Sequence, residues 1–154
     1  KNISYQIENR LEDISVKIPP GISTGKKLRL PGKGLSGYNG APNGDLYLNI
    51  NVLPHPIFAR DGYDLYVEKT IKFTQAALGT TIDVPTLDGT VKRIKVPAGT
   101  QNGTKIRMKG FGVPALKGTG AGKGDQYVKI SVAVPNKLTD RQLQLVRKLS
   151  EEGL

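Results

Sequence analysis

The sequence predicts a mainly β fold, built from two tandem copies of one β-rich module and followed by a short C-terminal helix. Three observations carry this prediction. The 154 residues include 19 Gly and 10 Pro, which long helices tolerate poorly. Apolar and polar residues alternate with period two in several short segments, which is typical of half-buried strands. One order of segments also occurs twice, at an offset of about 78 residues.

The repeat is clearest around two Pro-Gly turns. The segment ISVKIPPG at residues 14–21 is echoed by KRIKVPAG at residues 92–99. The glycines that follow keep the same spacing, and each copy then reaches a Gly-Asp pair, at residues 44–45 and 124–125. An alternating strand is predicted after each pair, and it ends before a proline. Two copies of one module therefore lie in tandem.

The second copy is the more complete one. Upstream of its Pro-Gly turn we predict a strand over 64–73, a helical turn over 74–79 and a strand over 81–84. The first copy lacks a counterpart of the opening strand, so we expect it to be truncated at its N-terminus. The expected domains are residues 1–59, a truncated first β-domain, residues 60–137, a second β-domain, and residues 138–154, a terminal helix.

The terminal segment changes its period. Thr139 and Gln142 have the spacing of a capping box, in which the two side chains satisfy free amides at a helix start. Leu143, Val146 and Leu149 follow at three-residue spacing, which predicts an amphipathic helix over 139–152. This apolar stripe packs either on its own module or on a second copy in a dimer, and the pattern leaves both open.

Composition excludes several classes of chemistry. With no Cys and with His55 as the only histidine, the chain has neither thiolate nor multi-histidine metal sites. The segment GKGLSG at residues 32–37 matches a dinucleotide fingerprint, but turn residues follow it where a helix is needed. We therefore expect no catalytic residues, no metal, no cofactor and no enzyme activity. The lack of Cys fits a cytoplasmic protein, and no apolar run approaches the roughly 20 residues of a membrane span.

The net charge of +10 offers two interpretations. Lys and Arg can solvate the outer faces of strands, since in residues 27–30 and 105–108 they alternate with apolar residues. A basic surface can also attract nucleic-acid phosphates, anionic lipid or acidic peptide tails. Under the second interpretation, Lys105 and Arg107 are candidate DNA contacts.

An apolar row near the N-terminus is the third candidate. Ile3, Tyr5 and Ile7 alternate along the first predicted strand, and Phe58 ends the same module. Such a stripe is either core or an exposed groove for an extended apolar peptide, captured by strand addition at a sheet edge.

Several segments, in this order and spacing, are shared with a known family: residues 16–25 (VKIPPGISTG), 28–34 (LRLPGKG), 44–47 (GDLY), 55–62 (HPIFARDG), 76–79 (AALG) and 84–89 (VPTLDG). They resemble the C-terminal substrate-binding region of DnaJ-type heat-shock co-chaperones, over nearly the whole chain. The cysteine-rich zinc region that one branch carries before the Ile-Pro-Pro-Gly segment is absent, which resembles the zinc-free branch. That branch includes a curved-DNA-binding protein, which makes DNA binding the alternative function.

The resemblance implies two β-sandwich domains in series and a short helix that forms a homodimer. It also implies that unfolded client polypeptides bind a hydrophobic depression on the first domain and pass to the seventy-kilodalton heat-shock chaperone. The known positions of that depression fall on Tyr5, Ile7 and Phe58, and Ile3 joins them through the alternation. Leu143, Val146 and Leu149 are the expected dimer contacts.

Overall fold

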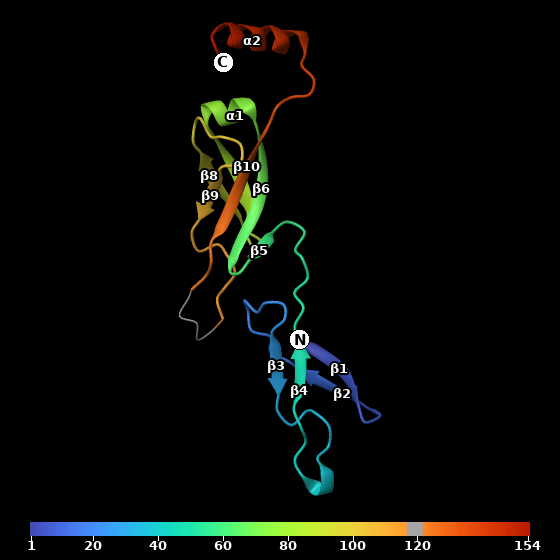
Figure 1. Cartoon of the computed structure of the whole chain (residues 1–154). Helices are drawn as coiled ribbons and strands as arrows, with labels where there is room; N and C mark the ends of the chain where they lie inside the picture. The colour runs from blue at the N-terminus through green and yellow to red at the C-terminus, as the bar shows by residue number, and fades with distance from the viewer. Residues whose placement is uncertain (117–121) are drawn as a thin grey trace. The chain divides into compact units, whose positions relative to one another are not determined.

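The structure, a computed structural model, describes residues 1–116 and 122–154 and confirms the mainly β fold. Within the described residues the strands form one four-stranded sheet, in the order β5-β6-β10-β9, and three two-stranded sheets, β1-β2, β3-β4 and β7-β8 (Figure 1). The elements are β1 (Asn2–Ile7), β2 (Arg10–Ser15), β3 (Lys27–Leu30), η1 (Tyr38–Gly40), β4 (Leu46–Asn49), β5 (Ala59–Asp61), β6 (Asp64–Lys72), α1 (Phe73–Leu78), β7 (Thr80–Pro85), β8 (Val91–Val96), β9 (Lys105–Met108), β10 (Gln126–Ala133) and α2 (Asp140–Glu151).

The chain forms two compact units. Unit 1 comprises Lys1–Val67 with Arg107–Tyr127, and unit 2 comprises Glu68–Ile106 with Val128–Leu154. The division falls within β6, β9 and β10, so these strands contribute residues to both units. Each unit combines two separate stretches of the chain, so the units do not coincide with the copies of the repeat. The domains at 1–59, 60–137 and 138–154 stay predictions.

The repeat predicted from the sequence has a structural counterpart. β3 and β9 are four-residue strands that lie 78 positions apart, and β4 and β10 begin 80 positions apart. Equivalent backbone bonds support them, because the Gly25 N–H donates to Ile50 O at 2.9 Å and the Gly103 N–H to Ile130 O at 2.8 Å. Both copies therefore use the same turn to bring their two strands together.

In each copy one aspartate carboxylate binds both an arginine and a backbone glycine N–H, and we call this arrangement the aspartate clasp. In the first copy, the Asp45 carboxylate accepts a bond from Arg29 Nε at 2.5 Å and one from the Gly32 N–H at 3.0 Å. In the second copy, the corresponding bonds measure 2.6 and 2.7 Å and join Asp125 to Arg107 and Gly110. The pKa of each aspartate carboxyl lies below its usual range. The hydrogen bond from the glycine N–H is the largest cause, and the neighbouring arginine guanidinium lowers the pKa further.

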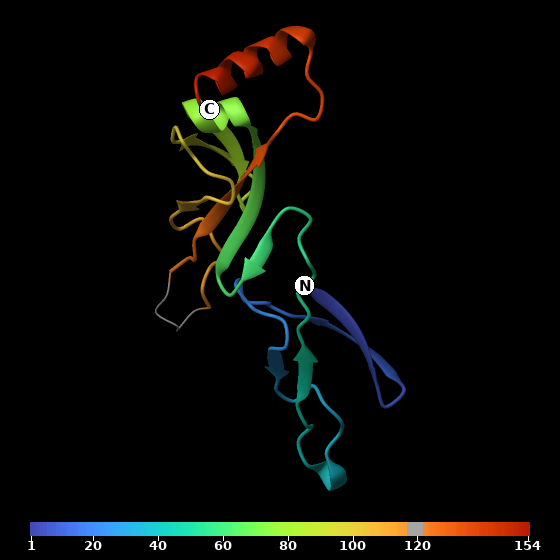
Figure 2. The ribbon, with the colours of Figure 1, turned by 45° about the horizontal axis from the view of Figure 1, so that its top comes forward.

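Each unit has its own apolar core. In unit 2, Val84, Val96, Val128 and Ile130 are fully buried, and they come from β7, β8 and β10. The predicted helical turn is present as α1, which runs between β6 and β7 (Figure 2). Among the described residues of unit 1, the buried apolar ones are Val16, Ile22, Phe58, Leu65, Val67, Met108 and Val113.

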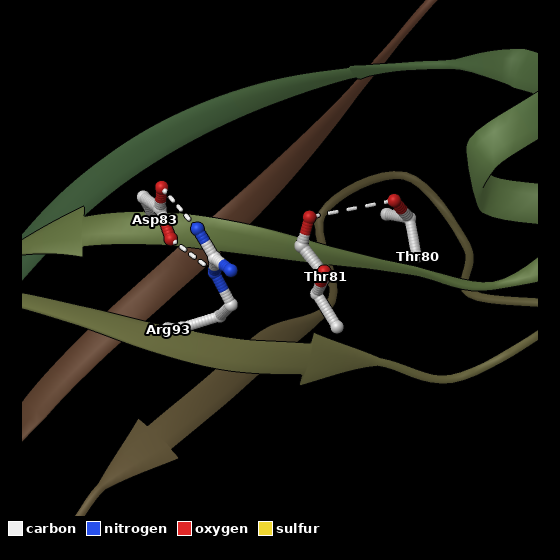
Figure 3. A network of polar contacts seen from close by, with 4 residues as sticks. All are labelled: Thr80, Thr81, Asp83 and Arg93. Carbon is white, nitrogen blue, oxygen red and sulfur yellow. Dashed lines mark hydrogen bonds and ion pairs between the residues drawn. The ribbon is translucent and has the colours of Figure 1, made fainter.

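The β7–β8 hairpin has an ion pair between two directly opposite residues. Asp83 and Arg93 are directly opposite, and the guanidinium donates to both carboxylate oxygens, at 2.8 and 3.2 Å (Figure 3). On the same strand, the Thr80 hydroxyl donates to Thr81 O at 3.4 Å. Because the Asp83–Arg93 pair is exposed, it fixes the register of the hairpin more than it adds to the free energy of unfolding.

The turn after β2 is fixed by a close backbone approach within unit 1. Gly21 has a φ of +86°, and a Cβ built on it would lie 1.9 Å from Pro114 O. Its own carbonyl accepts a bond from the Arg60 guanidinium at 2.8 Å, and the same guanidinium binds Ile22 O at 2.9 Å. Arg60 therefore holds this turn against β5.

We predict that Gly21→Ala destabilises the chain much more than Gly25→Ala. The two glycines have nearly the same φ, +86° and +84°, but nothing lies within 4 Å of a Cβ at Gly25. Gly25→Ala should cost about 1–2 kcal/mol of left-handed strain. Gly21→Ala should cost about 1–3 kcal/mol more, since the backbone must move. Urea unfolding followed by circular dichroism measures both, and equal losses would contradict the close approach.

We also predict an acid-dependent loss of stability from the aspartate clasps. Because the folded pKa of Asp125 lies below the unfolded value, its contribution is present above about pH 4 and is lost as the pH falls further. Asp125→Asn should therefore lower the urea midpoint at neutral pH, and the difference from the wild type should shrink in acid.

The urea midpoint is measured across this pH range, with Asp61→Asn as the control because Asp61 is an exposed aspartate outside the clasps. Acid should still lower the urea midpoint of the Asp125→Asn variant to some extent, because Asp45, Asp83 and Glu8 also have lowered pKa values. A difference between wild type and Asp125→Asn that is constant with pH would show that the clasp does not work through its charge.

Candidate peptide-binding site

The β1–β2 hairpin places the predicted apolar row on one face. Exposed and half-buried residues alternate along β1, and Ile3, Tyr5 and Ile7 are the half-buried ones. In the antiparallel register, Ile3 lies opposite Ile14 and Tyr5 lies opposite Glu12. The alternation predicted from the sequence is thus present, and this face combines an apolar row with a carboxylate.

The turn of this hairpin needs two left-handed residues. Glu8 and Asn9 have φ values of 45° and 62°, which are the signs that a two-residue type I′ turn requires. Asn tolerates this conformation better than Glu does. The Glu8 carboxylate compensates through two bonds, from the Ser36 N–H at 2.9 Å and from the Ser36 hydroxyl at 2.7 Å, and these bonds lower the pKa of Glu8. The turn is therefore fastened to the loop between β3 and β4.

The same loop holds the Tyr5 ring in place. The Tyr5 hydroxyl lies 2.9 Å from Glu12 Oε2 and 3.2 Å from Lys33 O, and Lys33 Nζ lies 3.9 Å from the same carboxylate oxygen. Burial, followed by the bond to Glu12, raises the pKa of Tyr5. The phenol is thus tethered at its tip, and its half-buried ring forms part of the hairpin face.

Phe58 is placed differently from the hairpin residues. Its side chain is only 5% exposed, so it belongs to the core of unit 1. His55 Nδ1 accepts bonds from the Ile57 N–H at 3.1 Å and the Phe58 N–H at 3.3 Å, and the His55 and Phe58 rings lie 5.1 Å apart. Phe58 therefore offers little free surface to a peptide, and the His55 ring is one of the groups packed near it.

Sequence reasoning missed the apolar side chains next to Phe58. Val52, Leu53 and Ile57 are exposed, and Leu53 is 78% exposed. The signal that could have found them is the pair of prolines at 54 and 56, which keeps this segment out of a sheet. Further exposed apolar residues of unit 1 are Leu11, Ile18, Leu35, Tyr38 and Tyr47.

The terminal helix has the predicted capping box. The Thr139 hydroxyl accepts from the Gln142 N–H at 3.3 Å, and the Gln142 side chain accepts from the Thr139 N–H at 2.9 Å. The helix buries none of its residues, and Leu143, Val146 and Leu149 are 39%, 48% and 38% exposed. Its apolar stripe is thus only partly covered within one chain.

The two candidate DNA contacts lie on β9. The Arg107 guanidinium is paired with Asp125, since its Nε and one terminal nitrogen both lie 2.6 Å from Asp125 Oδ2. This pairing gives Arg107 a structural role in the second copy, and DNA contact at Lys105 and Arg107 stays a prediction.

Residues 1–116 and 122–154 contain no group of three or more His, Cys, Asp or Glu that could hold a metal ion. Among the same residues, no helix has the length and apolar character needed to cross a membrane. Unit 2 carries an open hollow of about 670 Å³ lined by Leu78, Gly79, Thr80, Thr81, Lys95, Val96, Pro97 and Ala98.

Comparison with known proteins places the chain in a family. Residues 1–135 match the model of the DnaJ C terminal domain. The chain is 53% identical over 144 residues to "Chaperone protein DnaJ" of Parageobacillus thermoglucosidasius, covering 94% of this chain and 37% of that protein. It is 50% identical over 144 residues to the protein of the same name from Methanothermobacter thermautotrophicus, covering 94% and 38%.

A third relative, "Chaperone protein DnaJ" of Geobacillus thermodenitrificans, is 53% identical over 140 residues, covering 91% of this chain and 36% of that protein. The chain thus spans little more than a third of the length of these relatives. Their names do not distinguish the zinc-free branch, which stays a prediction, and none of them is named for DNA binding. The family match and these identities agree with the motifs and with the mainly β fold, and the chain belongs to the DnaJ C-terminal domain family.

Proposed function

We propose that this chain is the client-binding and dimerising region of a DnaJ-type co-chaperone. It holds unfolded polypeptides through apolar side chains on unit 1 and presents them to the seventy-kilodalton heat-shock chaperone. The observation that carries the proposal is the family match over residues 1–135, together with the half-buried row of Ile3, Tyr5 and Ile7 on the β1–β2 hairpin.

The physical basis of this function is reversible burial of apolar surface. A client side chain that leaves water on the hairpin face gains about 25 cal/mol per Å² of apolar area, with no covalent step. Strand addition along the hairpin would contribute backbone bonds that do not depend on the client sequence. This combination suits a protein that must bind many unrelated unfolded chains.

We predict that Tyr5→Ala with Ile7→Ala weakens client binding while the fold survives. Both side chains are half-buried on the hairpin, and each contributes at most a few kcal/mol of burial with a client, so affinity should fall by about tenfold or more. The measurement is light scattering of a denatured reporter enzyme, with increasing amounts of the chain present to suppress its aggregation. Leu11→Ala is the matched control, because Leu11 is exposed on the other face of the same hairpin.

Phe58 is left intact in this experiment, because truncating a core phenylalanine costs about 3–5 kcal/mol of stability and would confuse binding with unfolding. Tyr5→Phe separates the ring from its hydroxyl and should keep most of the activity. If the double variant suppresses aggregation as well as the Leu11→Ala control does, the hairpin face is not the client site.

We predict that Leu143→Asp with Val146→Asp yields monomers in sedimentation velocity. The two side chains are 39% and 48% exposed within one chain, so a second copy of α2 can cover them. Placing carboxylates in that contact would leave charges buried without partners. Gln144→Asp, an added carboxylate outside the stripe, should leave the dimer intact. A dimer that persists in the double variant would show that the stripe is not the contact.

A further inference from the structure

The chain contains three Asn-Gly sequences, Asn39-Gly40, Asn43-Gly44 and Asn102-Gly103. Asparagine is a chemically labile residue. The backbone nitrogen of the following residue can lose its proton and attack the side-chain carbonyl carbon. The new C–N bond closes a succinimide ring as the Cγ–Nδ2 bond breaks, and ammonia leaves. Water then opens the ring and gives aspartate or isoaspartate.

Glycine is the favoured second residue because it has no side chain to hinder the attack. The sequence alone therefore ranks the three sites equally. The structure separates them, because the attacking nitrogen must first be freed from any hydrogen bond that its N–H makes.

Two of the three sites are held by bonds between separate segments. The Gly44 N–H donates to Leu35 O at 2.9 Å, within the paired ends of the loop. The Gly103 N–H donates to Ile130 O at 2.8 Å. Asn102 is held on its side chain too, since its Oδ1 accepts from the Val132 N–H at 2.9 Å. Attack at either site requires opening of these bonds.

Asn39 lies in a different setting. It sits inside η1, a three-residue 3₁₀ turn that buries none of its residues, and both Asn39 and Gly40 are exposed. Its φ of 51° and ψ of 44° are not helical. Within this turn the Ala41 N–H donates to Tyr38 O at 3.1 Å, and short 3₁₀ turns such as the one that contains the Gly40 nitrogen have poor hydrogen-bond geometry. Only a local movement is needed to free this nitrogen.

We propose that Asn39 is a site of spontaneous deamidation in the native protein, and that it reacts before Asn43 and Asn102. The reaction needs only water and converts a neutral amide to a carboxylate three residues from Ser36. Ser36 is the residue that fastens the loop to the Glu8 carboxylate of the β1–β2 turn. The isoaspartate product also lengthens the loop backbone by one carbon. Ageing of the protein at Asn39 thus alters the loop that supports the hairpin.

The test is to incubate the intact chain in mildly alkaline buffer, digest it and locate the conversion by fragmentation mass spectrometry. Asn39 should convert several-fold, and up to about tenfold, faster than Asn43 and Asn102, because one intersegment hydrogen bond is worth up to about a factor of ten. In concentrated urea the three rates should converge, since the hydrogen bonds are gone. Asn39→Gln should remove the fast phase, and Asn43→Gln should keep it.

Two results would overturn the proposal. One is conversion of Asn43 or Asn102 in the native chain at the rate of Asn39. The other is a ratio of the three rates that is the same in urea as in buffer, because the local sequence and not the fold would then set the order.

Discussion

The close backbone approach at each Gly-Asp pair is the constraint on which the rest of the architecture depends. A Cβ built on Gly34 would lie 2.7 Å from Asp45 O, and one built on Gly112 would lie 2.4 Å from the carbonyl carbon of Gly124. These close main-chain contacts place the aspartate that follows each Gly within hydrogen-bond distance of an arginine and of a backbone N–H. Asp45 binds Arg29 and the Gly32 N–H. Asp125 binds Arg107 and the Gly110 N–H. Two strands and the ends of the loop between them are thereby held by one carboxylate, in both copies.

In the first copy this constraint also shapes the candidate site. The loop that leaves the clasp supplies Lys33 O to the Tyr5 hydroxyl, and Ser36 to the Glu8 carboxylate. In the second copy the equivalent segment binds the turn between β5 and β6 instead, since the Val113 N–H donates to Tyr63 O at 2.7 Å. One scaffold therefore serves two purposes, and the difference lies in the loop residues and not in the paired strands. The apolar face of β1 depends on that loop for its position.

The sequence was sufficient to predict features that depend on neighbouring residues. The repeat located β3 and β9, and the Thr139–Gln142 spacing located the start of α2. It was insufficient wherever tertiary cover decides the outcome. Alternation identifies the residues that share a face with Tyr5, but neither alternation nor the family resemblance says whether Tyr5 or Phe58 is covered by the rest of the chain. The tether on Tyr5 and the close approach at Gly21 come from segments distant in the sequence.

The segment before Phe58 suggests how an apolar surface can stay available without adding to a sheet. Pro54 and Pro56 lack N–H donors, and His55 Nδ1 already accepts from the Ile57 and Phe58 N–H groups. This stretch therefore offers few free donors to a neighbouring strand edge, although its apolar side chains are exposed. The exposed apolar side chains are therefore the main surface that this segment presents. Under the proposed function, strand addition at the two-stranded β1–β2 sheet supplies the backbone bonds that this segment does not.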